Sequence, residues 1–534
     1  MTSRIGRTSP PPPPRLRRLG NALSDVARTL TQRLFVITMI SAVCWIPKGA
    51  SKVVPESAEP PTQEEIDEIS KSGALERSND SEEEEDQEME VDDSQIEVGG
   101  AARALAAAKA LGKAQGDKSP NELQGITDGL GELDMDHYDE EDDEINVLST
   151  GLGDTYYPSN AMDPYLQGTD DDDEEDIEDR TIKPTDAVIV SACNEDDVSY
   201  LQVSIFEELE DGESNMYANN EIMLSAFPLC TAWLDCNLKG GESGDKGNFI
   251  AVGSMEPAIE IWDLDLLDEV QPFMVLGGVS KKKTGKKTSV KYKKGSHRDS
   301  VLGLAWNKVV RNALASASAD KTVKVWDMVT GKCTITLEHH TDKVQAVAWS
   351  RYAPEVLLSG SFDHTVALMD VRFNDRAPNT WSVAADVESV ALDPHNEHLF
   401  AVSLDNGTVQ GFDARTATSD STSGSKPIFT LHAHDKAVTS ISYNPIATNL
   451  LATGSMDKMV KLWDLSNNQP SCVASTNPKA GSVFSVAFSE DSPFQIAIGG
   501  SKGKLKVWDA LSAHGVVSRF GKFSNRAAET VPVD

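Results

Sequence analysis

The stretch VLGLAWNKVVRNALASASADKTVKVWD, residues 301–327, decides the fold. It combines an apolar strand that ends in an aromatic residue, a strand of small residues, a polar turn containing Asp, and a strand that ends in Trp-Asp. The same order recurs at 437–464, AVTSISYNPIATNLLATGSMDKMVKLWD. The closing Asp recurs at spacings of 64, 43, 43, 51 and 45, at Asp263, Asp327, Asp370, Asp413, Asp464 and Asp509. This period is typical of the four-stranded blades of a β-propeller.

Counting first strands predicts the number of blades. Six segments align, at 228–234, 301–307, 344–350, 387–393, 438–444 and 483–489. Two further segments, AVIVSA (187–192) and YLQVSIF (200–206), look like second and third strands without a first. The distant stretch ISAVCWI, residues 40–46, matches the missing pattern position for position, with Trp45 where Trp306 and Trp349 stand. We therefore predict an all-β, seven-bladed propeller whose first blade is split.

The segment that splits the first blade, residues 55–181, is strongly acidic. Between residues 56 and 180 there are 41 Asp and Glu against 7 Lys and Arg, so this part carries nearly all of the chain's formal net charge of −36. Runs such as SEEEED and DDDDEED hold too few apolar residues to offset the entropy cost of ordering. We predict a long disordered insertion, preceded by the first strand of blade 1 (39–54) and followed by the rest of the propeller (182–515).

The two ends of the chain leave alternatives open. Residues 1–38 contain seven Arg and one acidic residue, with leucines at helical spacing. This composition is typical of an organellar transit peptide; the alternative is a basic, Pro/Arg-rich upstream extension, disordered or not native, with Met39 as the working start. The last blade is closed either by a strand from RLFVIT (33–38) or by one near Val516–Phe520, within a tail at 516–534.

Cysteines and apolar runs indicate the setting. The six cysteines are scattered without paired spacing, and no secretory signal is present, so we expect a reduced, intracellular protein. The apolar runs are too short to cross a bilayer, which argues against a membrane partner.

The repeats resemble those of the WD-repeat family over residues 186–511. In that family a His, a Ser or Thr, a turn Asp and a Trp form a hydrogen-bonded chain within a blade, which satisfies buried polar groups. Carried over by position, the predicted tetrads are His297, Ser316, Asp320 and Trp326; His434, Thr453, Asp457 and Trp463; and His340, Ser359 and Asp363, where Met369 replaces the Trp. Glu256 and Lys502 occupy the turn-Asp place in two other blades.

These His and Asp residues could be mistaken for catalytic or metal-binding groups. They recur at one place in each blade, whereas a catalytic site needs unlike groups that converge once. No nucleotide-binding, hydrolase or metal motif occurs in the sequence. We expect no catalytic residue, cofactor, metal ion or small-molecule substrate.

A lysine-rich loop, residues 280–295, interrupts the repeats between the second and third blades. It contains Lys281, Lys282, Lys283, Lys286, Lys287, Lys291, Lys293 and Lys294, and no acidic residue. Three interpretations are open: a nuclear or nucleolar address, a salt-dependent RNA contact, or a solvated loop without a partner. Tyr292 is the one aromatic residue there that is available for base stacking.

Other charged features suggest partners. The acidic segment either screens basic partners such as ribosomal proteins or histones, folds back onto the lysine-rich loop, or solubilises the chain. Ser81, followed by four Glu, is a candidate site for an acidophilic kinase. Two blades end in Asp-x-Arg, at Arg372 and Arg415. This ending resembles the box by which some WD-repeat proteins dock onto the adaptor of a cullin-based ubiquitin ligase.

The order of features narrows the resemblance. A short first strand, an acidic tract, LDMDHYDEED (133–142), IKPTD (182–186) and a lysine-rich insertion follow one another as in one family of WD-repeat proteins. The resemblance implies a non-enzymatic scaffold in the nucleus and nucleolus, acting in ribosomal RNA processing and large-subunit assembly within a pre-ribosomal particle. The alternatives are a histone- or chromatin-binding adaptor and a ubiquitin-ligase substrate receptor.

Overall fold

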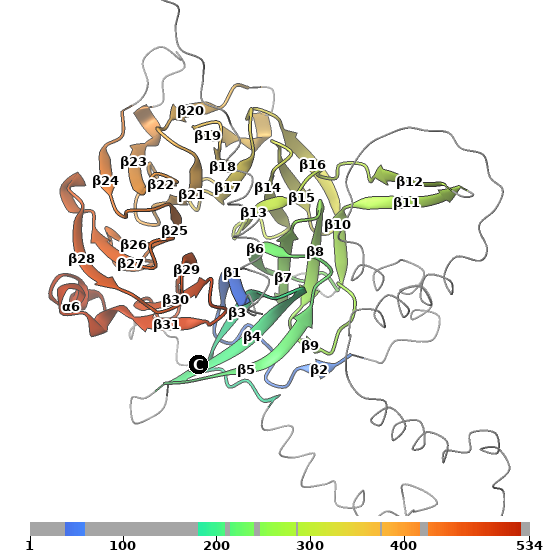
Figure 1. Ribbon diagram of the computed structural model, residues 1–534, viewed down its shortest axis with the longest axis horizontal. Helices are drawn as coiled ribbons and strands as arrows, with labels where there is room; N and C mark the ends of the chain where they lie inside the picture. Colours follow the sequence, from blue (N-terminus) through green and yellow to red (C-terminus); the bar gives the residue numbers. More distant parts are fainter. Residues whose placement is uncertain are drawn as a thin grey trace, which may run out of the picture. The chain divides into compact units, whose positions relative to one another are not determined.

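Antiparallel sheets arranged in a ring make up the fold (Figure 1). The computed structural model describes residues 38–58, 180–208, 214–239, 246–284, 287–373, 376–416 and 426–524. They belong to one of two units of the chain, Met1–Glu68 together with Asp173–Asp534, and the second unit is Ile69–Asp172. Of the acidic segment predicted to be disordered, 55–181, the structure describes residues 55–58, which include a two-residue strand, and 180–181. The remainder of that segment with its Ser81 phosphorylation site, and the predictions for residues 1–37, lie outside the described residues.

Blade 1 is assembled from two distant parts of the chain. Its strands, in the order in which they pair, are β1 (Thr38–Ile46), β3 (Ala187–Glu195), β4 (Val198–Glu208) and β5 (Ser214–Met223). In the antiparallel register of β1 and β3, Cys44 lies opposite Val190 and Trp45 opposite Ile189. The stretch ISAVCWI is therefore the first strand of blade 1.

The remaining sheets follow in chain order. Blade 2 holds β6 (Pro228–Cys236), β7 (Lys246–Ser254), β8 (Ala258–Asp263) and β10 (Met274–Gly277). Blade 3 holds β13 (Val301–Trp306), β14 (Ala313–Ser318), β15 (Val323–Asp327) and β16 (Lys332–Leu337). Blade 4 holds β17 (Val344–Trp349), β18 (Val356–Ser361), β19 (Thr365–Asp370) and β20 (Asn379–Ser382).

Three more blades complete the ring. Blade 5 holds β21 (Val387–Leu392), β22 (Leu399–Leu404), β23 (Thr408–Asp413) and β24 (Phe429–His432). Blade 6 holds β25 (Val438–Tyr443), β26 (Leu450–Ser455), β27 (Val460–Asp464) and β28 (Ser471–Thr476). Within the described residues, blade 7 holds β29 (Val483–Phe488), β30 (Gln495–Gly500) and β31 (Lys506–Asp509). The predicted seven-bladed propeller is confirmed.

A β-bulge marks the same place in each of the seven first strands that the structure describes. The register shifts between Ile40/Ala42, Pro228/Cys230, Val301/Gly303, Val344/Ala346, Val387/Ser389, Val438/Ser440 and Val483/Ser485. A bulge of this kind bends the strand and increases its local twist. Because β1 carries the bulge at the matching position, it has the geometry of a first strand as well as the sequence of one.

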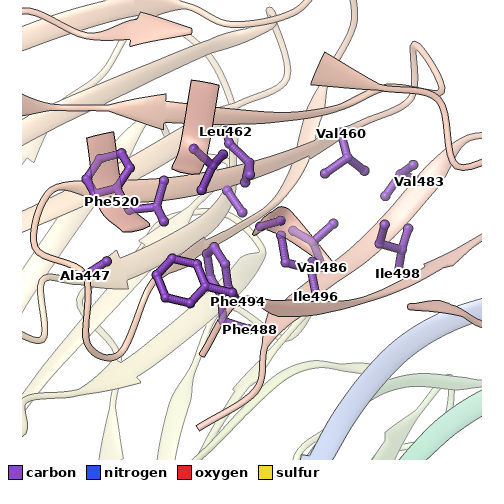
Figure 2. Close-up of a cluster of buried hydrophobic side chains, with 14 of the residues drawn as sticks. Ala447, Val460, Leu462, Val483, Val486, Phe488, Phe494, Ile496, Ile498 and Phe520 are labelled. Carbon is purple, nitrogen blue, oxygen red and sulfur yellow. The ribbon is translucent and has the colours of Figure 1, made fainter. Parts of the chain in front are cut away.

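The core lies between neighbouring blades. Figure 2 shows the cluster that joins blades 6 and 7, where Leu462 of β27 packs with Val486 of β29 and Ile496 of β30. Members of the cluster on one strand are two residues apart, such as Val460 and Leu462 on β27, so they lie on the same face of their sheet. Each buried aliphatic side chain stabilises the fold by about 1.5 to 3 kcal/mol relative to exposure.

A helix packs against the last two blades. The segment near Val516–Phe520, one of the two candidates for the strand that closes the last blade, forms the helix α6 (His514–Phe520), so that alternative was wrong. Val516 and Phe520 are four residues apart, which places them on one face of a helix. Both are buried in the cluster between blades 6 and 7. The 3₁₀ turns among the described residues include η4 (Val371–Phe373), η5 (Ala414–Thr416), η6 (Ser466–Asn468), η7 (Ala510–Ser512) and η8 (Gly521–Phe523).

The two ends of the acidic insertion meet. Leaving β1, the chain forms a two-residue strand β2 (Glu56–Ser57) that pairs in parallel with β9 (Leu266–Leu267) of blade 2. On its return, the amide of Ile182 donates to the carbonyl of Val53 at 2.8 Å. The insertion is therefore a loop tied at its base to the first two blades. None of the helices in the described ranges is long and apolar enough to span a membrane.

Candidate functional site

The lysine-rich insertion forms a backbone hairpin, where a loop had been expected. Its strands are β11 (Val279–Thr284) and β12 (Lys287–Tyr292), paired antiparallel with Val279 opposite Tyr292. The hairpin leaves the ring between blades 2 and 3 (Figure 1). The insertion is thus an ordered projection along most of its backbone, and Lys286 at its tip lies outside the described residues.

The base of the hairpin is fixed by hydrogen bonds. Gly277 and Gly278 have φ of +71° and +85°, which turn the chain out of β10 in a conformation that favours glycine. The amide of Gly278 donates to Ser296 Oγ at 2.8 Å, and the amide of Lys293 donates to the Gly278 carbonyl at 2.9 Å. The lysines at this end are therefore held at a defined place beside blade 3.

A groove of about 610 Å³ opens between the base of the hairpin and blade 3. Five cationic residues line it: Lys293, Lys294, Arg298, Lys321 and Lys324. Two carboxylates, Asp320 and Glu338, also line it. The structure thus brings Lys293 and Lys294 of the predicted patch together with three cations of blade 3 and its approach. Lys291 is exposed on β12, just outside the groove.

The His-Ser-Asp-Trp sets predicted for blades 3 and 6 form continuous hydrogen-bonded chains. In blade 3, Trp326 Nε1 donates to Ser316 Oγ at 2.8 Å, and Ser316 Oγ lies 2.7 Å from His297 Nε2. His297 Nδ1 lies 3.0 Å from Asp320 Oδ2. The corresponding distances in blade 6 are 3.0 Å from Trp463 to Thr453, 2.8 Å from Thr453 to His434, and 2.8 Å from His434 to Asp457.

Burial and hydrogen bonding determine which groups of these hydrogen-bonded sets carry a proton. Burial lowers the pKa of His297, although the neighbouring Asp320 opposes the effect. Burial alone would raise the pKa of Asp320, but hydrogen bonds from His297, Thr322 and the Arg298 amide hold that pKa below its usual range. A neutral imidazole then donates from Nδ1 to an ionised carboxylate and accepts at Nε2 from the Ser316 hydroxyl. Each polar side chain of this hydrogen-bonded set therefore has a partner within the blade.

Blade 4 compensates for the missing Trp. His340 Nδ1 lies 3.0 Å from Asp363 Oδ2, and its Nε2 lies 2.9 Å from Ser359 Oγ. Met369 has no group to donate to Ser359, and His339 Nε2 instead lies 3.2 Å from that hydroxyl. Burial lowers the pKa of His339 to about 4. In the described part of the chain, no group of three or more His, Cys, Asp or Glu is arranged to hold a metal ion.

The two arginines of the Asp-x-Arg endings are exposed but engaged. Arg372 makes a two-pronged contact with Asp370, through Nε at 3.0 Å and Nη2 at 2.6 Å. Arg415 contacts Asp413 in the same way, at 2.9 and 2.6 Å. Each guanidinium therefore has a partner within its own blade ending, and docking onto an adaptor through these side chains stays a prediction.

The central channel contains a feature that the repeat pattern does not indicate. A cavity of about 470 Å³ is lined by first-strand residues of the blades, among them Ser41, Gln345 and Glu388. Burial, together with the nearby Asp405 and Asp386, raises the pKa of Glu388 to about 7. Glu388 stands at the second position of its first strand, where the other blades carry uncharged residues. The charged residue at this position, Glu388, is the sequence feature that could have predicted a distinct group in the channel.

Comparisons with known proteins agree with the geometry. The family model described as "WD domain, G-beta repeat" matches residues 289–327, 331–370, 425–464 and 470–509. The chain is 37% identical to an uncharacterized WD repeat-containing protein of Schizosaccharomyces pombe over 498 residues, 91% of each chain. It is 30% identical to periodic tryptophan protein 1 of Saccharomyces cerevisiae, with 90% of each chain covered. It is 28% identical to the periodic tryptophan protein 1 homolog of Drosophila melanogaster, over 68% of this chain and 75% of the relative.

The similarity to both yeast proteins covers nine-tenths of the chain and so cannot come from the repeats alone. The matched lengths leave room for β1, the acidic insertion and the lysine hairpin in addition to the blades. On this evidence the chain belongs to the WD-repeat family and, within it, to the group of periodic tryptophan protein 1.

Proposed function

We propose that this chain is a non-enzymatic scaffold of ribosome assembly that acts in the nucleolus, in ribosomal RNA processing and maturation of the large subunit. The observation that carries the proposal is the similarity to periodic tryptophan protein 1 over nine-tenths of both chains. The proposal also draws on the order of features that resembles a nucleolar family. It concerns binding alone, and it draws on the His and Asp residues of blades 3, 4 and 6, which are hydrogen-bonded within their own blades.

The layout of charge suits a scaffold that meets both RNA and basic proteins. The lysine hairpin and the cationic groove beside it attract phosphate. The acidic insertion, with its 41 Asp and Glu between residues 56 and 180, attracts basic proteins. The hairpin lies between blades 2 and 3, and the two ends of the insertion are tied to blades 1 and 2, so one molecule carries segments of both charges.

Affinity purification of the full chain from nuclear extract, with and without RNase, tests the proposal. We expect pre-ribosomal RNA and large-subunit proteins in the untreated sample, and loss of part of this material after RNase. A matched variant in which Lys281, Lys282, Lys283 and Lys287 are replaced by Ser keeps the propeller intact. Loss of nucleolar staining in that variant, with unchanged particle binding in extract, would identify the hairpin as an address. A purification without ribosomal components would overturn the proposal.

A histone- or chromatin-binding adaptor is the second candidate, favoured by the acidic insertion, which would suit histone tails. The same purification separates the two functions. Histones and chromatin factors that survive RNase, without pre-ribosomal RNA, would favour the second.

A further inference from the structure

We infer that the groove between the base of the lysine hairpin and blade 3 binds the phosphate backbone of single-stranded RNA, and that Lys324 is its anchor. The inference deepens the proposed function by naming a partner class and a site, and it rests on that function for the presence of RNA. Its first support is the lining of the groove, where five cationic residues outnumber two carboxylates.

Lys324 is buried without a negative partner. Lys324 is 6% exposed, and its Nζ donates to the Thr336 hydroxyl at 3.0 Å. No carboxylate of the described residues pairs with it. A buried ammonium group is unfavourable unless a counter-charge accompanies it. A phosphate oxygen in the groove would supply that counter-charge.

Lys461 shows that the position alone does not create the site. Lys324 and Lys461 stand at the same place in VKVWD and VKLWD, on β15 of blade 3 and β27 of blade 6. The Nζ of Lys461 donates to the carbonyl of Ala433 at 2.7 Å, next to His434. The lysine hairpin joins blade 3 just before His297, and blade 6 has no such insertion before His434. The surroundings of Lys324 therefore differ from those of Lys461, and Lys324 lines the groove.

The two carboxylates in the lining compete little for the lysines. Asp320 accepts from His297, from the Arg298 amide at 2.9 Å, and from Thr322 Oγ1 at 2.7 Å. The Asp320 carboxylate is therefore already stabilised by hydrogen bonds from blade 3 and its approach. Glu338 is exposed at the rim, where water screens its charge.

The lining favours RNA over a phosphorylated peptide. No aliphatic side chain lines the groove, so it lacks the apolar subsites that peptide side chains occupy. Tyr292 at its edge is 44% exposed, and its hydroxyl donates to the Arg298 carbonyl at 3.2 Å, which orients the ring. An exposed, oriented aromatic ring beside a cationic groove is suited to stacking one unpaired base. Lys291, exposed on β12, continues the basic surface toward the hairpin.

The test is the binding of a fluorescent oligouridine of about 12 nucleotides to the purified full chain, at salt concentrations between about 50 and 200 mM. Lys324→Met should weaken binding about tenfold and reduce the slope of log affinity against log salt by about 0.7. Lys461→Met is the matched control and should stay within about twofold of the wild type, because Lys461 lies outside the groove.

Two further variants keep the test informative if Lys324→Met fails to fold. Arg298→Ala changes an exposed side chain of the groove and should weaken binding about fivefold. Tyr292→Leu should weaken binding at least about fivefold through lost stacking. Wild-type affinity in the Lys324 and Arg298 variants would overturn the site. Tighter, Lys324-dependent binding of a phosphoserine peptide would overturn the assignment to RNA.

The outcomes separate this inference from the proposed function. Pre-ribosomal particles that co-purify with a chain unable to bind oligouridine would refute the groove and leave the scaffold function standing. Groove-dependent RNA binding without any pre-ribosomal component in the purification would refute the function and support the site.

Discussion

Trp45 Nε1 donates to the carbonyl of Ala487 at 2.9 Å, across 442 residues of sequence. Trp349 makes the equivalent contact between blades 4 and 3, donating to the carbonyl of Ala305 at 3.0 Å. In both cases the Trp stands five residues after the residue at which the bulge begins, Ile40 or Val344, and contacts the fifth residue of the preceding first strand. The bond between blades 1 and 7 therefore repeats a contact of the continuous part of the ring.

Replacing Trp45 should destabilise the propeller, because the contact between blades 1 and 7 is weakened. Trp45→Phe keeps most of the apolar area and loses one hydrogen bond, which should cost about 1 kcal/mol. Trp45→Ala also leaves a cavity and should cost about 3 kcal/mol, since the side chain is half-buried. Urea unfolding of the full chain measures both. Trp349→Phe and Trp349→Ala are the matched variants, and losses confined to the Trp349 pair would contradict the equivalence.

The acidic insertion should be dispensable for folding. Because Ile182 and Val53 are joined by a backbone hydrogen bond, residues 59–179 can be replaced by a Gly/Ser linker of about 15 residues. Closing a shorter loop costs less entropy, so the propeller should be unchanged or more stable by up to about 2 kcal/mol. Urea unfolding of the shortened and full chains would show this. A large loss of stability would mean that the insertion packs on the ring.

The same shortened chain tests whether the insertion folds back onto the lysine hairpin. If it competes with RNA, the shortened chain should bind oligouridine more tightly at low salt, and the difference should shrink as salt is added. Equal affinity at low salt would exclude fold-back and leave the screening and solubilising roles.

The hydrogen-bonded chain of blade 3 should contribute measurably to stability. Ser316→Ala removes the shared partner of Trp326 Nε1 and His297 Nε2, and both buried groups lose a hydrogen bond. An unsatisfied buried polar group is costly, so we expect a loss of about 2 kcal/mol in the free energy of unfolding. Ser475→Ala on the exposed face of β28 is the control and should change stability by less than about 0.5 kcal/mol. Equal effects of the two variants would count against the structural role of the chain.

Glu388 should make the propeller less stable as the pH rises. Its pKa in the folded state, about 7, lies above the ordinary value of 4.5, so the folded state keeps a proton that the unfolded chain releases. The contribution of this proton is present below about pH 4.5 and lost as the pH rises to about 7. Glu388→Gln should therefore raise stability at pH 8, by about 1 kcal/mol once screening in the channel is allowed for, and change little at pH 4.

Thermal unfolding of Glu388→Gln at the two pH values checks this sign. Glu338→Gln, at the exposed rim of the groove, is the control, and should have little effect at either pH. A variant less stable than the wild type at pH 8 would show that the Glu388 carboxylate has a favourable partner in solution.

The blades could be predicted because each one repeats the same local physics. The same residue types recur at a fixed period: small residues in the second strand, the turn Asp and the closing aromatic. The first strand of a split blade can therefore be recognised by its match to the other first strands, even when it lies far away in the sequence. Trp45 was assigned in this way. The hydrogen-bonded sets around His297 and His434 could be predicted for the same reason. Residues at corresponding positions of two blades have corresponding neighbours.

Features outside the repeat were harder to predict. The apolar residues of 514–520 fit a strand and a helix equally well over so short a length, and the contact of Val516 and Phe520 with blades 6 and 7 selects the helix. The lysine hairpin lacks the apolar alternation of a strand. The groove depends on residues from three parts of the chain, and Lys324 differs from Lys461 only in what surrounds it.

The most direct test of the split first blade is the thermal unfolding of a chain that begins at residue 182, with and without a synthetic peptide of residues 38–58. Without β1, the inner edge of β3 and the contacts of Trp45 with blade 7 are lost. We predict a midpoint lower by about 10 °C or more, or no cooperative transition, and recovery when the peptide is added. A truncated chain that unfolds at the temperature of the full chain, with or without the peptide, would contradict the account.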